Sequence, residues 1–338
     1  MRFKKILIAL AVCMAFAIVG CTAQQPSKEA ADAPAPRADH VDIPGSVEAI
    51  PSSYQTPCDE QGSLEYFYYE GPALEDGAEN SKYAIVYLPY GYDPEEDTPY
   101  NVLYLMHGAG GSAEGQLGTP DDRDDEVNMI DHMIANGDME PMIIVAATYY
   151  PNNEEIDTDD WDAALTKEFG TELRDYLMPQ LEEEYNTYAS DTTPEGLKAS
   201  REHRAFGGFS MGGVTTWYRV CDSMDYFKYF LPVSGCLTWG TEHYSGDAAA
   251  QFIENSIQKQ GFEPSDFFIY ATTGENDYAL GYYNPQIQAM QSMGDPFVFE
   301  GNNQNIAFLV NEGEEHDGDG YARALYGGLP VISQMMQA

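Results

Sequence analysis

Basic residues are scarce in this sequence. The 338-residue chain contains 16 lysines and arginines against 56 aspartates and glutamates, which gives a formal net charge of −40. A surface this acidic repels nucleic acid and anionic lipid head groups, so we expect no nucleic-acid partner and no direct binding to such lipids. Neutral ligands are not repelled, and the charge therefore leaves several classes of small or polymeric ligand open.

Long apolar runs are absent after the first 20 residues. Residues 1–5 are basic and residues 6–19 are apolar but too few to span a bilayer, so we expect residues 1–20 to be an export signal. The run ends in Ile-Val-Gly-Cys, which resembles the lipobox of bacterial lipoproteins. We expect Cys21 to be lipidated and to anchor an exported protein to the outside of the cell membrane. A plain signal with an incidental Cys21 is the alternative.

Cysteine is scarce as well. Besides Cys21 the mature chain keeps three cysteines, and none has the spacing of a zinc site or of a redox Cys-x-x-Cys motif. Cys221 and Cys236 flank a predicted strand, and the sequence leaves open whether they form a disulfide. The acidic clusters at 121–126 and 316–320 lack the ligand pattern of a calcium-binding loop. We therefore expect no metal site and no cofactor.

The rest of the chain divides into a linker and one domain. Residues 21–44 are rich in small and polar residues and in proline, without apolar periodicity, so we expect a disordered linker there. Residues 45–338 are predicted to form a single α/β domain. Its strand-like apolar segments are residues 64–70, 82–89, 102–106, 142–147, 204–209, 230–233, 267–272 and 306–310.

Helical patterns separate these segments. They lie at 126–135, at 167–185, where Pro179 is expected to bend the helix, and after Ser210. Alternation of apolar strands with helices indicates a mainly parallel central sheet of about eight strands with helices on both faces.

One short motif suggests chemistry. The sequence Gly-Phe-Ser-Met-Gly at 208–212 fits the G-x-S-x-G nucleophile elbow, in which a strand turns sharply into a helix and the serine hydroxyl projects from the sheet. The glycines are required because a Cβ beside so tight a turn would collide with backbone. The pentapeptide alone also fits an ordinary Gly/Ser turn, so its context decides. Ser210 is the candidate nucleophile.

Candidates for the other groups that such a serine needs lie further along the chain. An acyl-transfer serine requires a base and an acid that orients the base. In the fold built around this elbow, the acid and then the histidine follow the serine, each just after a strand. Asp277 and His316 follow two of the predicted strands in this order. We predict His316 as the base and Asp277 as the acid, with Glu275 in the same turn as the alternative acid.

The glycine-rich segment 107–111 follows another predicted strand. The elbow fold places such a loop beside the serine, where it completes the oxyanion hole. We predict the donors to be the N–H groups of Ala109 and of Met211, the residue after the serine. The segment does not match a phosphate-binding loop. His107 is expected to shape the loop and not to act as a base.

Together these motifs resemble the esterase D-like, feruloyl-esterase-type α/β-hydrolases, the family 1 carbohydrate esterases. The resemblance spans about residues 83–330 and rests on LMHGAGG, EHRAFGGFSMGG, GEND and EHD, in this order. It implies an α/β-hydrolase fold and hydrolysis of feruloyl or acetyl esters on plant cell-wall polysaccharides, without metal or nucleotide. The segment after His316 departs from the family pattern, which leaves the acyl group open.

Aromatic residues near the predicted strand ends are candidates for substrate contacts. Tyr149, Trp239 and Tyr282 are predicted to stack on a sugar or a phenolic ring. We expect a serine esterase that acts on ester-decorated polysaccharides or oligosaccharides. An acyltransferase of the same fold and a catalytically silent, polysaccharide-binding lipoprotein are the alternatives.

Overall fold

The computed structural model describes residues 41, 43–156, 158, 160 and 162–337. The predicted export signal, Cys21 and most of the predicted linker lie outside these residues. Val41, which the sequence assigned to the linker, is buried together with Val47 as part of one of the two hydrophobic cores.

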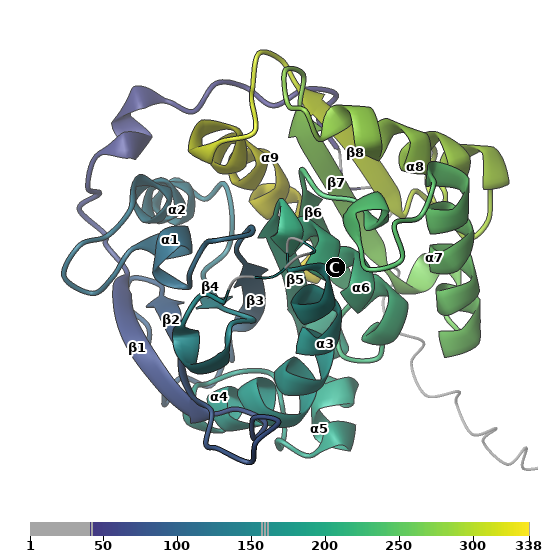
Figure 1. Ribbon diagram of the computed structural model, residues 1–338. Helices are drawn as coiled ribbons and strands as arrows, with labels where there is room; N and C mark the ends of the chain where they lie inside the picture. The colour runs from purple at the N-terminus through teal and green to yellow at the C-terminus, as the bar shows by residue number, and fades with distance from the viewer. Residues whose placement is uncertain (1–40, 42, 157, 159, 161, 338) are drawn as a thin grey trace, which may run out of the picture. The chain divides into compact units, whose positions relative to one another are not determined.

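An eight-stranded sheet forms the centre of the described part of the chain (Figure 1). Its order is β1-β2-β4-β3-β5-β6-β7-β8; β1 pairs antiparallel with β2 and β2 with β4, and every other pairing is parallel. The strands are β1 (Ser63–Glu70), β2 (Ser81–Leu88), β3 (Asn101–Met106), β4 (Met142–Ala147), β5 (Arg204–Phe209), β6 (Tyr229–Val233), β7 (Phe268–Gly274) and β8 (Ile306–Asn311). The prediction of a mainly parallel sheet of about eight strands is confirmed.

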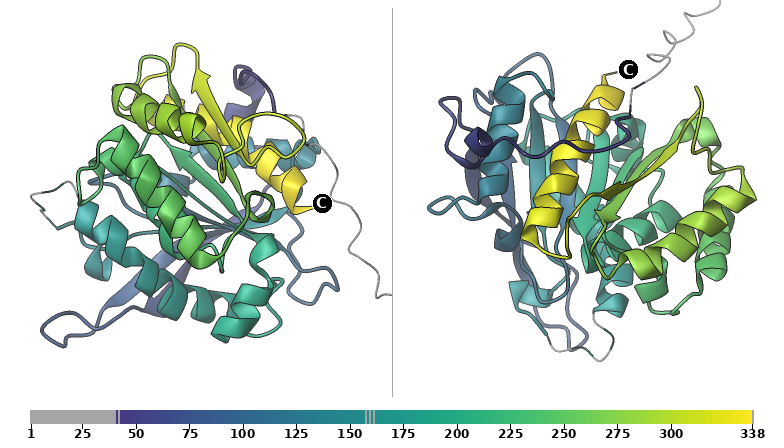
Figure 2. Two further views of the ribbon diagram at one scale, coloured as in Figure 1. Left: turned by 90° about the vertical axis from the view of Figure 1, so that its right-hand side faces the viewer. Right: turned by 90° about the horizontal axis from the view of Figure 1, so that it is seen from above.

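Helices cover both faces of this sheet (Figures 1 and 2). They are α1 (Glu114–Leu117), α2 (Asp125–Ala135), α3 (Ala163–Glu172), α4 (Met178–Glu184), α5 (Pro194–Ala199), α6 (Met211–Asp222), α7 (Gly246–Gln260), α8 (Leu280–Met293) and α9 (Gly318–Met336). Apolar residues of α1, α2 and α9 pack on one face, and those of α3 to α8 pack on the other.

The alternation of side chains along each strand explains the apolar runs in the sequence. In β3, Tyr104 and Met106 join the core under α3 to α8, whereas Leu103 and Leu105 join the core under α1, α2 and α9. Successive side chains of a strand point to opposite faces, and a strand that is covered on both faces must therefore be apolar throughout.

A buried ion pair fixes the strand that leads to the elbow. Arg204, the first residue of β5, donates from Nε and Nη2 to the two carboxylate oxygens of Glu182 in α4, at 2.6 and 2.7 Å. Both side chains are 1% exposed, and Tyr104 adds a hydrogen bond of 2.9 Å to the same carboxylate. Removing one partner of a buried bidentate ion pair of this kind destabilises a protein by several kcal/mol. The pair therefore fixes α4 against β5 and β3.

The long helix expected at 167–185 is divided. Between α3 and α4 the chain forms a turn of π-helix at Leu173–Leu177, and Pro179 lies in the first turn of α4. Proline lacks an N–H to donate to the preceding turn, and a wider π turn accommodates this gap in the hydrogen-bond ladder. The irregularity expected at Pro179 therefore precedes the proline.

Cys221 and Cys236, for which the sequence left pairing open, are free thiols, as is Cys58. Among the described residues, no helix combines the length and hydropathy needed to cross a bilayer. The same part of the chain contains no group of three or more histidine, cysteine or acidic side chains arranged to hold a metal ion.

Candidate active site

Ser210 occupies the sharp turn between β5 and α6. Its φ of 57° and ψ of −117° lie in a region that residues with a side chain rarely adopt. Its N–H donates to Val233 O on the neighbouring strand at 2.9 Å. A Cβ on Gly212 would lie 1.9 Å from Met106 O, and one on Gly208 2.5 Å from the same oxygen. The two glycines of the motif therefore allow the turn to pack directly against β3.

The structure brings Ser210 together with the predicted base and acid. His316 Nε2 lies 2.9 Å from Ser210 Oγ, and His316 Nδ1 lies 2.8 Å from Asp277 Oδ1. The Asp277 side chain is fully buried, and that of His316 is 10% exposed. The three residues follow β5, β7 and β8, whose parallel arrangement places their carboxyl ends at one edge of the sheet.

Asp277 is held as a carboxylate by its neighbours. Burial opposes its ionisation, but hydrogen bonds from His316, from the Ser234 hydroxyl and from the Ala279 N–H outweigh burial and lower the pKa of Asp277. Thr273 Oγ1 donates to its second oxygen at 3.2 Å. The alternative acid, Glu275, instead accepts from the Gly313 N–H at the surface. Asp277 is thus the carboxylate that contacts His316.

The glycine-rich loop lies against the serine. A Cβ on Gly108 would be 3.1 Å from Ser210 Cβ, so the two backbones pass at close range. Met211 is the first residue of α6, where the helix itself offers no acceptor for the N–H. The two predicted oxyanion donors, Ala109 and Met211, therefore belong to segments that meet at Ser210.

Two tyrosines after β4 hold this loop. The Tyr149 hydroxyl donates to Gly108 O at 3.0 Å, and the Gly110 N–H donates to the Tyr150 hydroxyl at 2.8 Å. Tyr150 in turn donates to Asp162. Ala109, the predicted oxyanion donor, lies between the two anchored residues.

Tyr149 does not have the position that the sequence analysis predicted. It is 4% exposed and its ring packs on the His107 ring at 4.5 Å between centroids. Its hydroxyl is engaged with Gly108 O, beneath the loop. These contacts make Tyr149 a support of the loop, and its ring does not line the cleft described below.

His107 has the structural role expected of it. Its Nδ1 donates to Gly108 O at 2.6 Å and its Nε2 lies 2.7 Å from Thr148 Oγ1. Burial lowers the pKa of His107 to about 4, so the imidazole is neutral at pH 7. Below it, Lys82 Nζ donates to Thr148 O at 2.7 Å and pairs with Glu172 at 2.6 Å. The loop therefore rests on a continuous set of buried polar contacts.

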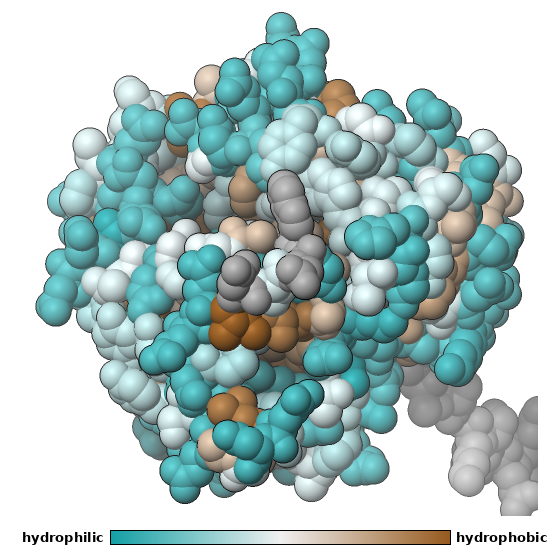
Figure 3. Space-filling model, viewed as in Figure 1, coloured by the Kyte–Doolittle hydropathy of each residue, from teal (hydrophilic) through white to brown (hydrophobic). Residues whose placement is uncertain are grey.

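A cleft of about 560 Å³ opens beside Met211. Three aromatic residues line one part of it, Trp239, Tyr278 and Tyr282, and we call them the aromatic wall. Asp160, Thr238 and His243 also line the cleft. The Trp239 ring lies 5.8 Å from that of Tyr278 and 5.5 Å from that of Tyr282, between centroids. Tyr278 packs at 4.3 Å on the His316 ring. Apolar side chains also gather near α3, in the middle of the face shown in Figure 3.

The aromatic wall contains two predicted residues, Trp239 and Tyr282, and one that sequence reasoning missed. Tyr278 directly follows Asp277, and this adjacency to the predicted acid was the available signal. Trp217 of α6 is fully buried and donates its indole N–H to Gly235 O at 3.0 Å.

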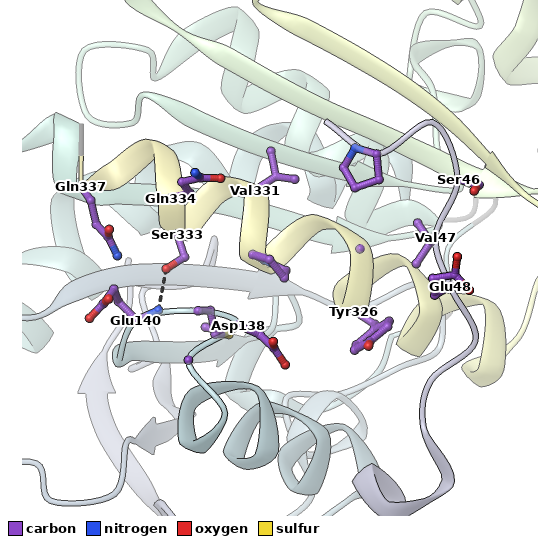
Figure 4. A pocket seen from close by; sticks show the side chains of 15 residues that line it. Ser46, Val47, Glu48, Asp138, Glu140, Tyr326, Val331, Ser333, Gln334 and Gln337 are labelled. Carbon is purple, nitrogen blue, oxygen red and sulfur yellow. Dashed lines mark hydrogen bonds between the residues drawn. The ribbon is translucent and has the colours of Figure 1, made fainter. Parts of the chain in front are cut away.

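A second cavity, of about 540 Å³, lies between α9, the segment 44–48 and the turn 137–140 (Figure 4). The Glu140 N–H donates to Ser333 Oγ across it. The turn precedes β4, so this cavity lies at the opposite edge of the parallel strands from Ser210. None of the predicted site residues lines it.

The elbow, the parallel sheet and the strand-end positions of Ser210, Asp277 and His316 define an α/β-hydrolase fold. The chain belongs to the Esterase family, described as "Putative esterase", whose model matches residues 79–298. It belongs to the feruloyl-esterase-type family that the sequence resembles.

Two relatives of known name are both endo-1,4-beta-xylanases by name. The chain is 38% identical over 284 residues to endo-1,4-beta-xylanase Y of Acetivibrio thermocellus, covering 83% of this chain and 24% of the relative. It is 29% identical over 242 residues to an endo-1,4-beta-xylanase/feruloyl esterase of Xylanibacter ruminicola, covering 69% of this chain and 27% of the relative. The chain thus spans about a quarter of the length of these relatives.

Solved structures of feruloyl and ferulic acid esterases are also similar to this chain. The feruloyl esterase module of Clostridium thermocellum, a serine-to-alanine mutant complexed with sinapinate, matches with a TM-score of 0.73 and 34% identity, over 86% of this chain and 96% of the module. A CE1 ferulic acid esterase of Anaeromyces mucronatus matches with a TM-score of 0.65 and 19% identity, over 88% of this chain and 100% of that one. The second likeness concerns the fold alone.

Proposed function

We propose that this chain is a serine esterase that releases feruloyl groups from plant cell-wall polysaccharides or their oligosaccharides through Ser210, His316 and Asp277. The observation that carries the proposal is the continuous chain of contacts from Asp277 through His316 to Ser210, at 2.8 and 2.9 Å, beside an aromatic-walled cleft. Nucleophile, base and orienting acid within hydrogen-bond reach are the arrangement that acyl transfer requires.

The first half of the reaction forms an acyl-enzyme. Ser210 Oγ attacks the ester carbonyl while His316 Nε2 takes the hydroxyl proton, and Asp277 stabilises the resulting imidazolium through Nδ1–H. The negative charge on the former carbonyl oxygen is received by the Ala109 and Met211 N–H groups. Collapse of this intermediate breaks the bond to the sugar oxygen, which leaves with the proton from His316. The alcohol is released and the acyl group stays on Ser210.

The second half restores the serine. A water molecule gives a proton to His316 and attacks the acyl carbonyl, and the same two N–H groups stabilise the second oxyanion. The bond to Ser210 Oγ breaks and the proton returns from His316 to the serine. The net change is hydrolysis of one ester to an acid and an alcohol.

The aromatic wall supports a phenolic acyl group over acetyl. Trp239, Tyr278 and Tyr282 offer ring faces next to Met211, where an acyl group bound to Ser210 would extend. Aromatic rings of ligand and protein attract each other in offset or edge-to-face arrangements, whereas an acetyl group reaches no such partner. The relatives include a feruloyl esterase, which supports the same acyl group.

A direct experiment tests the proposal. The purified protein is offered methyl ferulate, p-nitrophenyl acetate and feruloylated arabinoxylan, with Ser210→Ala as the blank, and a fluorophosphonate probe is used to label the nucleophile. We expect ferulate release, labelling at Ser210 and a loss of about 10⁴- to 10⁶-fold in kcat in the variant. Equal rates for wild type and variant would refute the assignment. Transfer of the acyl group to added sugar in preference to water would favour the acyltransferase alternative.

The N-terminal segment supports a further part of the proposal. A basic start, a short apolar run and a cysteine at its end are the features of an exported lipoprotein, anchored through Cys21. Metabolic labelling with a fatty acid followed by membrane fractionation tests it: wild type should carry label and sediment with membranes, and Cys21→Ala should do neither.

A further inference from the structure

Three tyrosines of the β1–β2 hairpin lie on one face of the sheet. Tyr66 and Tyr68 are two residues apart in β1, and Tyr83 of β2 pairs directly with Tyr68. The rings of Tyr66 and Tyr68 lie nearly parallel, 6.1 Å apart between centroids, and Tyr83 packs against them at 5.2 and 6.0 Å. We call this group the tyrosine surface.

Two of these rings are open to solvent, and that of Tyr83 is half-buried. Tyr68 is 71% exposed and Tyr66 is 38% exposed, although the alternate residues Phe67 and Tyr69 are buried in the core. β1 is the outer strand of the sheet, where charged residues commonly protect the edge. In a chain so rich in acidic residues, a cluster of exposed rings on an edge strand indicates a surface that binds something.

Polar groups border the tyrosine surface. A pocket of about 410 Å³ is lined by Tyr68 and Tyr83 and by the polar side chains of Glu70, Ser81, Asn152 and Gln180. Aromatic faces combined with hydroxyl, amide and carboxylate groups match a sugar, which has apolar C–H faces and a rim of hydroxyls.

The tyrosine surface lies at the same end of the strands as Ser210, the end where the parallel strands have their carboxyl termini. Lys82, the neighbour of Tyr83, donates to Thr148 O just beyond the carboxyl end of β4, and Thr148 Oγ1 contacts His107 at the start of the glycine-rich loop. The Tyr83 hydroxyl donates to Glu114 in α1, the helix that follows the same loop. A polymer bound at the catalytic serine and extending toward β1 would therefore meet these rings.

We propose that the tyrosine surface is an accessory binding site for the neutral backbone of the polysaccharide whose esters are cleaved at Ser210. This inference rests on the proposed function for the identity of the polymer. The net charge of −40 and the carboxylate of Glu70 in the adjoining pocket disfavour a polyanionic chain, so an uncharged backbone such as that of xylan is the fitting occupant.

Binding is measured with the full chain carrying Ser210→Ala, by affinity electrophoresis in gels containing neutral arabinoxylan or polygalacturonate. We expect retention by arabinoxylan only. In this background Tyr68→Ala should weaken retention about fivefold, the loss of roughly one ring contact, whereas Tyr68→Phe should retain it. Tyr90→Ala is the matched control, because Tyr90 is 57% exposed and lies outside the tyrosine surface.

Kinetics separate this proposal from that for the catalytic site. With Ser210 intact, Tyr68→Ala should raise KM for feruloylated arabinoxylan and leave kcat/KM for methyl ferulate unchanged. Unaltered retention and KM in Tyr68→Ala would overturn the accessory site and leave the esterase assignment intact. Retention of wild type by polygalacturonate, equal losses in Tyr68→Ala and Tyr90→Ala, or a change in oligomeric state without a change in retention would also overturn it. A protein without esterase activity that still binds arabinoxylan through Tyr68 would refute only the catalytic proposal.

Discussion

The residues around Ser210 and the aromatic wall share one edge of the sheet, but their side chains are held differently. Asp277 and His316 are held by hydrogen bonds and are almost completely buried. Tyr278 and Tyr282 are 56% and 53% exposed and contact Trp239 through their rings. The arrangement of Ser210, His316 and Asp277 is thus held by hydrogen bonds, whereas the aromatic wall is held by ring contacts, one of which joins Tyr278 to His316. Substitutions in the two regions should have different kinetic consequences.

Among substitutions that leave Ser210 in place, the largest effect is expected at Asp277. Asp277→Asn removes the acceptor that keeps the proton on His316 Nδ1 and favours the wrong tautomer, so kcat for methyl ferulate should fall about 10³- to 10⁴-fold. Glu275→Gln is the matched control, because the Glu275 carboxylate binds the Gly313 N–H and not His316. Steady-state kinetics measure both. Comparable losses in the two variants would show that the turn as a whole, and not the Asp277 contact, is responsible.

A smaller and selective effect is expected from the aromatic wall. Trp239→Ala should lower kcat/KM for methyl ferulate about 10- to 100-fold, because the central ring of the wall is lost. The rate with p-nitrophenyl acetate should change by less than about threefold, since a small acyl group does not reach the wall. Parallel assays with the two esters give this ratio. If both rates fall together, the distinction between the two regions is wrong.

A third effect concerns the loop support. Tyr149→Phe removes the hydrogen bond to Gly108 O and keeps the buried ring, so kcat should fall about 3- to 10-fold with little change in KM. Tyr229→Phe is the matched control: its hydroxyl also donates to a backbone carbonyl, that of Met335, at the other edge of the sheet. A purely structural role for Tyr149 would give both variants the same loss of stability and no loss of kcat.

The smallest effect is one of stability and pH. Burial lowers the pKa of His107 to about 4, whereas an unfolded histidine titrates near 6.5. The unfolded state therefore binds the proton first, and the free energy of unfolding should decrease as pH falls from about 6.5 to about 4, by at most about 3 kcal/mol. His107→Gln should lack this part of the pH dependence. Urea unfolding at a series of pH values measures it, and parallel slopes in the two proteins would contradict the assignment.

Much of the fold and the positions of Ser210, Asp277 and His316 could be predicted from the sequence. Each lies just after an apolar run, and such runs identify central strands because both faces are covered. Once the strands are parallel, residues that follow them must meet at one edge, whatever their separation in the chain. The functional assignment of these residues stays a prediction that the experiments above test.

The sequence was less informative about which side chains face the cleft, because this depends on side-chain direction. Tyr149 follows β4 as expected, but whether its ring lies beneath the loop or faces the cleft depends on contacts with His107 and Gly108 from a distant segment. Tyr278 was missed for the same reason, since its position against His316 comes from the turn after β7. Tyr68 carries no motif at all, and only its exposure on an edge strand distinguishes it.

The backbone conformation at Ser210 has a cost in conformational free energy that the rest of the domain must offset. A left-handed conformation of this kind costs a residue with a side chain about 1–3 kcal/mol, a cost that glycine escapes. The proposed nucleophile thus lies at a position where glycine would be less strained than a residue with a side chain. A glycine there would relieve the backbone strain, so a side chain is tolerated at this turn only because the packing of the surrounding strands and helix outweighs the local conformational preference.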